Sequence, residues 1–288
     1  MRLRALAKIN LGLDILGKRS DGYHEVRMIM QTISMYDVLE IHPRKEPGIG
    51  MTTNLPYIPT DERNLVYKAA KLLMDEYEIQ DGLRIHLRKF IPVAAGMAGG
   101  SSDAAATLVG LNRLFHLGLS EEELMERGVK IGADVPYCIM RGTALAEGIG
   151  EKLTRLDPVP DCFILVGKPG ISVSTKTAYE SLDLQNLSYR PDIEGIMKAI
   201  EEDNLLHMTA SMGNVFEPGI AERHPVIYKI KHHMEENGAL AAMMSGSGPT
   251  VFGIYDSQSK VKNAALALKR SGLCKTVFAT RVFNNRTR

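Results

Sequence analysis

The chain has 288 residues, of which 44% are hydrophobic and 24% are charged, and its formal net charge is +1. This size suits a globular protein of one large or two moderate domains, and a charge so close to zero excludes a global attraction to nucleic acid or to an acidic membrane surface. No apolar run approaches the ~18 residues of a membrane-spanning helix, and three widely spaced cysteines without a C-x-x-C pair are typical of a reducing compartment, so we expect a cytoplasmic protein.

The first residues predict a long strand. Apolar residues alternate with polar ones from residue 3 to residue 15, which places Lys8, Asn10 and Asp14 on one face. On spacing alone, a solvated face is the favoured interpretation of Lys8 and Asn10. A turn at Asp21-Gly22 follows, and then two β-rich runs over residues 26–34 and 37–43.

Helices enter the pattern after a Gly/Pro-rich connector over residues 47–59. The periodicity predicts an amphipathic helix over 64–77, a strand over 83–89 and a helix over 102–115. Ser120 and Glu123 have the spacing of a capping box, so a further helix is expected to begin there and to end near Gly132.

The second half of the chain repeats this mixture of strands and helices. We expect strands over 143–148 and 162–169, helices over 176–182, 193–202 and 226–237, an apolar hairpin broken at 246–249, a helix over 257–271 and a last strand over 276–283. Without a regular βαβ alternation, this order favours an α+β fold over a doubly wound sheet.

The segment "PVAAGMAGGSS", residues 92–102, joins the predicted strand to the predicted helix. Its glycines let the backbone approach a ligand closely, and the first N–H groups of a helix attract an anion. The hydroxyls of Ser101 and Ser102 are placed to reach phosphate oxygens or a Mg²⁺ shell, whereas Asp103 is expected only to complement the helix dipole. A serine-capped flexible turn is the alternative. The lysine of the common G-x-x-x-x-G-K-[ST] loop is absent.

Two shorter motifs have ordinary explanations when each is taken alone. In "GADVPY", Asp134 precedes a proline-restricted turn and is more often a turn residue than a catalyst. In "DGYH", Tyr23 and His24 suit base stacking and polar recognition, but such loop residues are usually only exposed. His232 and His233 lack the spacing of zinc ligands.

Together, and in this order, these motifs resemble the GHMP kinase superfamily. Its phosphate loop has the form P-x-x-x-G-[LM]-[GA]-[GS]-[GS]-S, which residues 92–102 fit. Within the superfamily, "AKINL", "DGYH", "GADVPY" and "MSGSGPTVFG" resemble the branch that phosphorylates a cytidine-diphosphate-linked methylerythritol. The similarity runs from Lys8 to Gly253. Ala94 and Ala95 replace glycines that are common there, so the loop should be stiffer. Tyr179 replaces a common phenylalanine and keeps the stacking face.

The resemblance implies a two-lobed fold. An N-terminal ATP-binding lobe over 1–155 would be β-rich and similar to ribosomal protein S5, with its phosphate loop at 92–102. A ferredoxin-like substrate-side lobe would cover 156–288, with ATP and substrate bound in a cleft between the lobes. The implied cofactors are ATP and Mg²⁺, with the metal bound mainly through ATP oxygens and no protein ligand assigned. The implied partner is a small-molecule substrate, and the chain is expected to be a monomer or a weak homodimer.

The resemblance also implies roles for individual residues. Lys8 and Asp134 would be catalytic. The ATP-binding residues would be Pro92, Val93, Ala94, Ala95, Gly96, Met97, Ala98, Gly99, Gly100, Ser101 and Ser102, with Asn64 and Leu65 on the adenine side. The substrate-binding residues would be Asn10, Tyr23, His24, Thr175 and Tyr179.

The implied reaction is ATP-dependent phosphorylation of the substrate 2-hydroxyl in the non-mevalonate isoprenoid route. One alternative is a sister kinase for mevalonate or homoserine, which "DGYH" and Tyr179 disfavour. A second is a non-catalytic nucleotide-binding protein, which the presence of both Lys8 and Asp134 disfavours.

Overall fold

The structure is a computed structural model that describes residues 1–288 except 181, 183, 185–186, 188 and 285–288. The chain forms two compact units that interleave along the sequence. Unit 1 consists of Met1–Ala7, Met35–Val93 and Ala98–Met140, and unit 2 of Lys8–Ser34, Ala94–Met97 and Arg141–Arg288. Strands β1 (Arg2–Lys18) and β2 (His24–Arg44) contribute to both units. The assignment of 1–155 and 156–288 to an ATP-binding and a substrate-side lobe stays a prediction.

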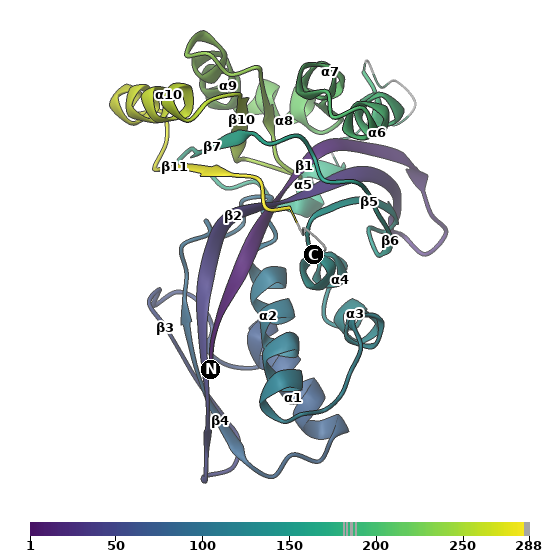
Figure 1. The fold of residues 1–288 in the computed structure, drawn as a ribbon, viewed down its shortest axis with the longest axis vertical. Coiled ribbons are helices and arrows are strands. Elements are labelled where there is room, and N and C mark those ends of the chain that lie inside the picture. The colour runs from purple at the N-terminus through teal and green to yellow at the C-terminus, as the bar shows by residue number, and fades with distance from the viewer. Residues whose placement is uncertain (181, 183, 185–186, 188, 285–288) are drawn as a thin grey trace. The chain divides into compact units, whose positions relative to one another are not determined.

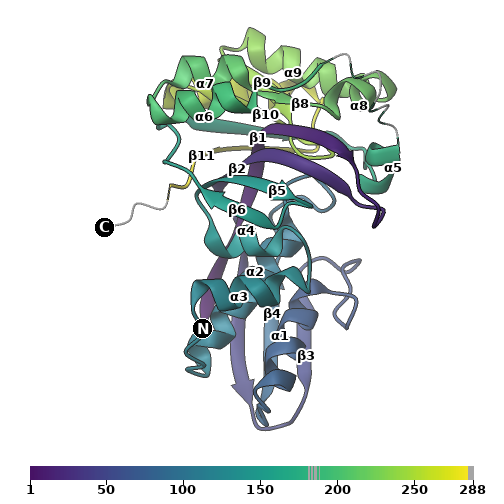
Figure 2. The same cartoon turned by 90° about the vertical axis from the view of Figure 1, so that its right-hand side faces the viewer.

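Unit 1 combines one end of a sheet with helices. The later half of β2 pairs antiparallel with β4 (Gly82–Arg88), and β4 pairs parallel with β3 (Ile49–Thr53). Helices α1 (Leu65–Glu76) and α2 (Gly99–Leu114) lie side by side, as Figures 1 and 2 show. Two further helices complete the unit, α3 (Glu121–Val129) and α4 (Val135–Met140).

The first sheet of unit 2 has the order β6-β5-β2-β1-β8 in its described residues. The early half of β2 pairs antiparallel with β5 (Thr143–Gly148), which pairs antiparallel with β6 (Lys152–Arg155). On the other side, β1 pairs parallel with β8 (Gly213–Asn214). After strand β7 (Phe163–Lys168), the described chain forms helices α5 (Thr175–Glu180), α6 (Ile193–Glu201), α7 (Leu205–Ser211) and α8 (Glu217–Arg223).

The second sheet of unit 2 has the ferredoxin-like arrangement. Its strands in the described chain are β7 (Phe163–Lys168), β9 (Ala241–Met244), β10 (Val251–Tyr255) and β11 (Thr276–Arg281). All neighbours are antiparallel in the order β11-β7-β10-β9. Helices α9 (Val226–Glu236) and α10 (Gln258–Ser271) pack against the sheet (Figure 1). With α9 after β7 and α10 after β10, the order is the split βαβ-βαβ pattern. The expected α+β class is confirmed.

Several local predictions are confirmed and others are wrong. The capping box of Ser120 and Glu123 starts α3 as expected. The two expected β-rich runs are instead the single strand β2, and the turn expected in "GADVPY" continues into α4. The described end of the expected helix over 176–182 is Glu180, and residue 181 lies outside the described chain. No helix among the described residues has the length and apolar character needed to cross a membrane.

Candidate active site

The predicted phosphate loop follows β4 and leads into α2. Its apolar side chains Ala95 and Met97 are buried and anchor it. The backbone turns through the left-handed region at Ala94, Gly96 and Ala98, with φ of 50°, 69° and 53°. Helix α2 starts at Gly99, earlier than the expected residue 102, and its N-cap residue Ala98 makes no side-chain cap. The first N–H groups of α2 are thus not capped by a side chain, which suits an anion.

The polar residues of this helix start differ from expectation. The Ser102 side chain is buried, and its hydroxyl donates to the Leu6 carbonyl oxygen at 2.6 Å and lies 3.3 Å from the Cys138 sulfur. The Ser102 hydroxyl is therefore bonded inside the protein, whereas it was expected to reach phosphate oxygens or a Mg²⁺ shell. Asp103 lies beyond the first turn, is buried, and pairs with Lys89. The expectation that it merely complements the helix dipole is wrong, because it is part of an internal ion cluster.

The residues predicted for the adenine side lie at the start of α1. Asn64 caps this helix by accepting from the Val66 N–H at 2.9 Å, and its amide donates to the Pro59 carbonyl at 2.7 Å. Leu65 approaches the start of α2, since a Cβ added to Gly100 would lie 3.5 Å from its Cδ1. The beginnings of α1 and α2 are therefore neighbours within unit 1.

The centre of the loop contacts the motif "MSGSGPTVFG", residues 244–253. The Ser245 hydroxyl donates to the Gly96 carbonyl at 2.9 Å, and a Cβ on Gly96 would lie 2.1 Å from the Ser245 carbonyl oxygen. Thr175 hydrogen-bonds Ser247 of the same motif at 3.1 Å. Asn214, which sequence reasoning missed, donates to the Met244 and Gly246 carbonyls, each at 2.8 Å. Nothing in its sequence context signals this role, because the carbonyls lie about thirty residues away in the chain.

Lys8 and Asn10 are buried, with exposures of 5% and 0%, so the expected solvated face is wrong. The Lys8 ammonium donates to Asn10 Oδ1 at 2.8 Å, and the Asn10 amide contacts the Met28 sulfur at 3.2 Å. The Lys8 backbone N–H also donates to the Met97 carbonyl at 3.2 Å. Lys8 thus makes two contacts within unit 2: its ammonium is held by Asn10, and its backbone N–H binds the predicted phosphate loop.

Asp134 lies in unit 1, directly before α4. It is half-buried, and its carbonyl accepts from the Cys138 N–H at 3.1 Å, which closes the first turn of α4. The backbone of "GADVPY" is therefore fixed by the helix that it begins. Lys8 belongs to unit 2, and the catalytic roles of both residues stay predictions.

An aromatic cluster in unit 2 contains two of the predicted substrate residues. The rings of His24 and Tyr179 stack with centroids 4.7 Å apart, and Phe216 meets Tyr179 edge-on at 4.9 Å. Burial, and secondarily the charge of Lys18, lower the pKa of His24, which favours its neutral ring. Tyr23 is exposed next to this cluster in the chain. Phe216 was not predicted, since no local pattern distinguishes it from a core phenylalanine.

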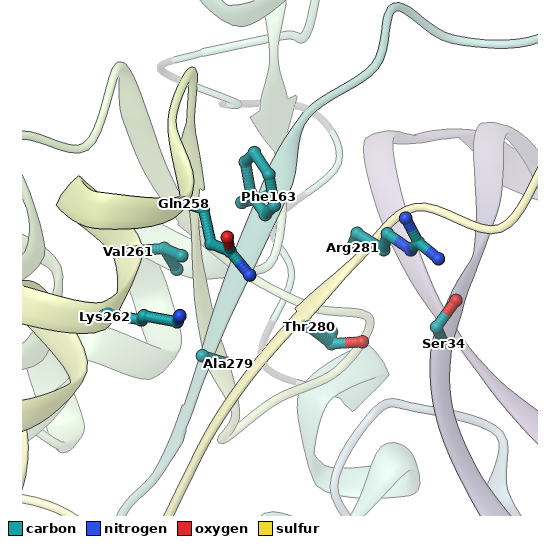
Figure 3. Close-up of a pocket in the computed structure, with 8 residues that line it drawn as sticks. All are labelled: Ser34, Phe163, Gln258, Val261, Lys262, Ala279, Thr280 and Arg281. Atoms are coloured by element: carbon teal, nitrogen blue, oxygen red, sulfur yellow. The ribbon is translucent and has the colours of Figure 1, made fainter.

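A separate hollow of about 410 Å³ lies on unit 2 (Figure 3). Phe163 of β7, Lys262 of α10 and Arg281 of β11 are among the eight residues that line it. None of the residues predicted for the active site is among those eight.

Two protein-family models match the chain. The N-terminal domain of the GHMP kinases matches residues 64–142, and the C-terminal domain of the GHMP kinases matches residues 187–273. The first match contains the predicted phosphate loop and Asp134, and the second contains Phe216 and the motif "MSGSGPTVFG" at 244–253.

Individual proteins are similar over the whole chain. A 4-diphosphocytidyl-2-C-methyl-D-erythritol kinase of Lachnoclostridium phytofermentans is 53% identical over 284 residues, which cover 99% of this chain and 98% of that protein. A crystal structure of 4-(cytidine 5'-diphospho)-2C-methyl-D-erythritol kinase is similar with a TM-score of 0.85 at 30% identity, covering 99% of this chain and 100% of that one. L. major mevalonate kinase, solved with R-mevalonate, reaches a TM-score of 0.77 at 18% identity, covering 99% and 96%, which is a likeness of fold alone.

Proposed function

The chain belongs to the GHMP kinases and, among them, to the 4-diphosphocytidyl-2-C-methyl-D-erythritol kinases, and we propose on this basis that it transfers the γ-phosphoryl group of ATP to the 2-hydroxyl of that substrate. The products are the 2-phosphate and ADP, and the reaction is a step of the non-mevalonate isoprenoid route. The observation that carries the proposal is the identity of 53% along 99% of the chain. The likeness to a mevalonate kinase is one of fold, so the sister substrates are not favoured.

The phosphates of ATP are bound, in this proposal, by backbone groups of residues 92–102. The support is the start of α2, where Ala98 provides no side-chain cap and Gly100 is exposed. N–H groups at a helix start, together with the helix dipole, stabilise a phosphate without a lysine. Ser101 supplies a hydroxyl of this turn in the proposal, because that of Ser102 is bonded inside the protein. Asn64 and Leu65 are proposed to bound the adenine.

Lys8 and Asp134 carry the chemistry in this proposal. Asp134 accepts the proton of the 2-hydroxyl or orients that hydroxyl, and Lys8 stabilises the charge on the transferring group. Two observations support the role of Lys8: its ammonium is fixed by Asn10, and its backbone holds the loop at Met97. Phosphoryl transfer depends mainly on such positioning and charge neutralisation.

The cytidine is proposed to bind at the aromatic cluster. Tyr179 offers a stacking face whose edge contact with Phe216 keeps the ring in place, and Tyr23 adds a second, exposed ring. The neutral His24 ring can donate one hydrogen bond and accept another, which suits the polar edge of a base. Thr175 is proposed to contact the substrate from the start of α5, next to Ser247.

Mg²⁺ is proposed as the metal that accompanies ATP. Among the described residues, no group of three or more His, Cys, Asp or Glu side chains has the arrangement of a metal site. In this proposal ATP phosphate oxygens supply most ligands of the cation, and the Ser101 hydroxyl, in the first turn of α2, is a candidate protein ligand. When bound, Mg²⁺ neutralises charge on the β- and γ-phosphates.

A coupled assay of ADP release tests the proposal, run with the cytidyl substrate, with mevalonate and with homoserine. Of these three substrates, we expect only the cytidyl substrate to be phosphorylated. Asp134→Ala should lower kcat by at least ~100-fold while ATP binding, titrated directly, is retained. Asp81→Ala, at an exposed carboxylate of the same unit, is the matched control and should be normal.

Two outcomes would contradict the assignment. Phosphorylation of mevalonate or homoserine at least as efficient as that of the cytidyl substrate would reject the substrate. Near-normal turnover in Asp134→Ala would remove that residue from the mechanism.

A further inference from the structure

Three ionisable side chains meet in the interior of unit 1. Asp37 comes from β2, Lys89 follows β4, and Asp103 lies on α2, and their exposures are 0%, 6% and 2%. The Lys89 ammonium donates to Asp37 Oδ2 and, at 2.6 Å, to Asp103 Oδ2. Two carboxyls therefore share one cation away from water, an arrangement that needs a further positive charge or a proton to be neutral.

The two carboxyls have unequal surroundings. The second oxygen of Asp37 accepts from the backbone N–H groups of Phe90 and, at 2.8 Å, of Ile91. The second oxygen of Asp103 is buried and has no hydrogen-bond partner among the described residues. Asp37 is thus surrounded by donors, as a carboxylate requires, whereas Asp103 is not.

The surrounding charges agree with this asymmetry. Burial raises the pKa of Asp103 well above its usual 3.8, the Lys89 ammonium opposes the rise, and Asp37 adds to it through its charge and a hydrogen bond. Burial also lowers the pKa of Lys89, but the two carboxyls outweigh this and raise it, so Lys89 stays charged.

Among the described residues of unit 1, the buried charged side chains are those of Asp37, Lys89 and Asp103. Helices α1, α3 and α4 contact α2, and the residues that α3 buries are Leu124 and Gly128. The buried residues of α1 are apolar, and the titratable residues that α4 buries are Tyr137 and Cys138. Strand β1 carries Arg4, whose guanidinium lies 4.7 Å from the ring centroid of Tyr36, the residue before Asp37.

The cluster holds both ends of the phosphate loop. Directly before the loop, Asp37 accepts from the N–H groups of Phe90 and Ile91. At its end, a Cβ added to Gly99 would lie 3.2 Å from Lys89 Nζ and 3.1 Å from Ile91 Cγ2, so the ammonium lies against the first residue of α2. Asp103 extends this contact one turn further along the helix.

We propose that Asp37, Lys89 and Asp103 form a positioning cluster for the phosphate loop, and that at neutral pH the cluster carries one proton on its two carboxyls, mainly on Asp103, so that its net charge is zero. The positioning part rests on the proposed ATP-binding role of the loop. The protonation part is independent of ATP binding, because it is tested by the stability of the folded protein.

Protonation is tested by the pH dependence of stability. Above the usual pKa of an aspartate the unfolded chain loses this proton while the folded protein keeps it, so folding takes up one proton. Urea unfolding is measured at half-unit steps from pH 5 to pH 7 for the wild type and Asp103→Asn. The unfolding constant of the wild type, relative to the variant, should rise about tenfold per pH unit. A ratio that does not change with pH would overturn the protonation.

Positioning is tested by the binding of ATP, titrated with a non-hydrolysable analogue, and by the KM values of both substrates. Lys89→Met should raise Kd for the analogue and KM for ATP at least ~10-fold with little change in KM for the cytidyl substrate, because the two loop ends lose their common anchor. Asp103→Asn keeps a neutral partner for Lys89 and should stay within about threefold of the wild type.

A second variant provides the same test if Lys89→Met does not fold. Lys89→Met with Asp37→Asn leaves no charge in the cluster and should show the same selective loss of ATP affinity. Arg127→Met is the matched control, because it removes the Arg127–Glu76 ion pair of unit 1 away from the loop. Equal ATP affinity in the wild type and the folded Lys89 variants would overturn the positioning role. A wild type that fails to bind ATP would reject the proposed function and leave the pH result standing.

Discussion

The contact between Gly96 and Ser245 makes a strong prediction for Gly96→Ala. Gly96 has φ +69°, and an added Cβ would lie 2.1 Å from the Ser245 carbonyl oxygen, where an ordinary contact needs at least 3.4 Å. Both partners are backbone, so one segment must move by more than an ångström. Gly272 is a matched control in the same unit, since its φ is +70° and nothing lies within 4 Å of the added Cβ.

The difference in the free energy of unfolding between Gly96→Ala and Gly272→Ala measures the cost of the steric clash at Gly96. A left-handed conformation costs an alanine about 1–2 kcal/mol at either site. Overpacking adds about 1–3 kcal/mol at Gly96 alone, so we expect a loss of about 2–5 kcal/mol in the free energy of unfolding for Gly96→Ala and about 1–2 kcal/mol for Gly272→Ala. A displacement of about 1 Å in a group that positions phosphate should also lower kcat/KM for ATP by roughly 100-fold.

Urea unfolding and the coupled ADP-release assay measure both effects. We expect Gly272→Ala to keep the kcat/KM of the wild type. Equal losses of stability in the two variants, or an unchanged kcat/KM in Gly96→Ala, would refute the inference that the loop depends on this close contact.

Two further predictions concern the aromatic cluster. Tyr179→Ala should raise KM for the cytidyl substrate roughly tenfold with little change in kcat, because stacking on a base contributes mainly to binding. Tyr179→Phe keeps the aromatic face, so its KM and kcat should be near those of the wild type. A fall in kcat at unchanged KM in Tyr179→Ala would contradict a stacking role. The pKa of His24 is lowered in the fold, so below its usual value of 6.5 the unfolded chain binds more protons and the stabilising effect of the neutral ring is lost as pH falls. As pH falls from 7.5 to 5, the urea concentration at the midpoint of unfolding should therefore fall more for the wild type than for His24→Gln. Equal falls in the two proteins would show that His24 is not the titrating group.

Elements with local signals were predictable from the sequence. Helices α1, α3 and α10 are capped by the side chains of Asn64, Ser120 and Ser257. Each capping residue lies within four residues of the N–H group that it binds, so a local sequence pattern indicates where the helix begins. The apolar hairpin of β9 and β10 and the glycine loop before α2 are local in the same sense. The α+β class followed from the order of these elements.

Features that depend on distant partners were not predictable from the residues alone. Alternation in β1 shows that Lys8 and Asn10 share a face, but burial of that face depends on what packs over it. The polar Asp37 continues β2 without interruption because its carboxylate binds N–H groups more than fifty residues away. The resemblance to a family implied catalytic roles for Lys8 and Asp134, which no spacing rule in the sequence indicates.

The phosphate loop shows how distant contacts replace a local preference. Ala94 and Ala98 adopt φ of 50° and 53°, where glycine would be free of strain and each alanine costs about 1–2 kcal/mol. Such a backbone persists only when its surroundings fix it more strongly than the strain opposes it. Three attachments do so here: Asp37 directly before the loop, Ser245 at Gly96, and the Lys8 N–H at Met97. These attachments hold the loop in a conformation that alanine disfavours, and removing one of them should weaken the binding of ATP more than that of the second substrate.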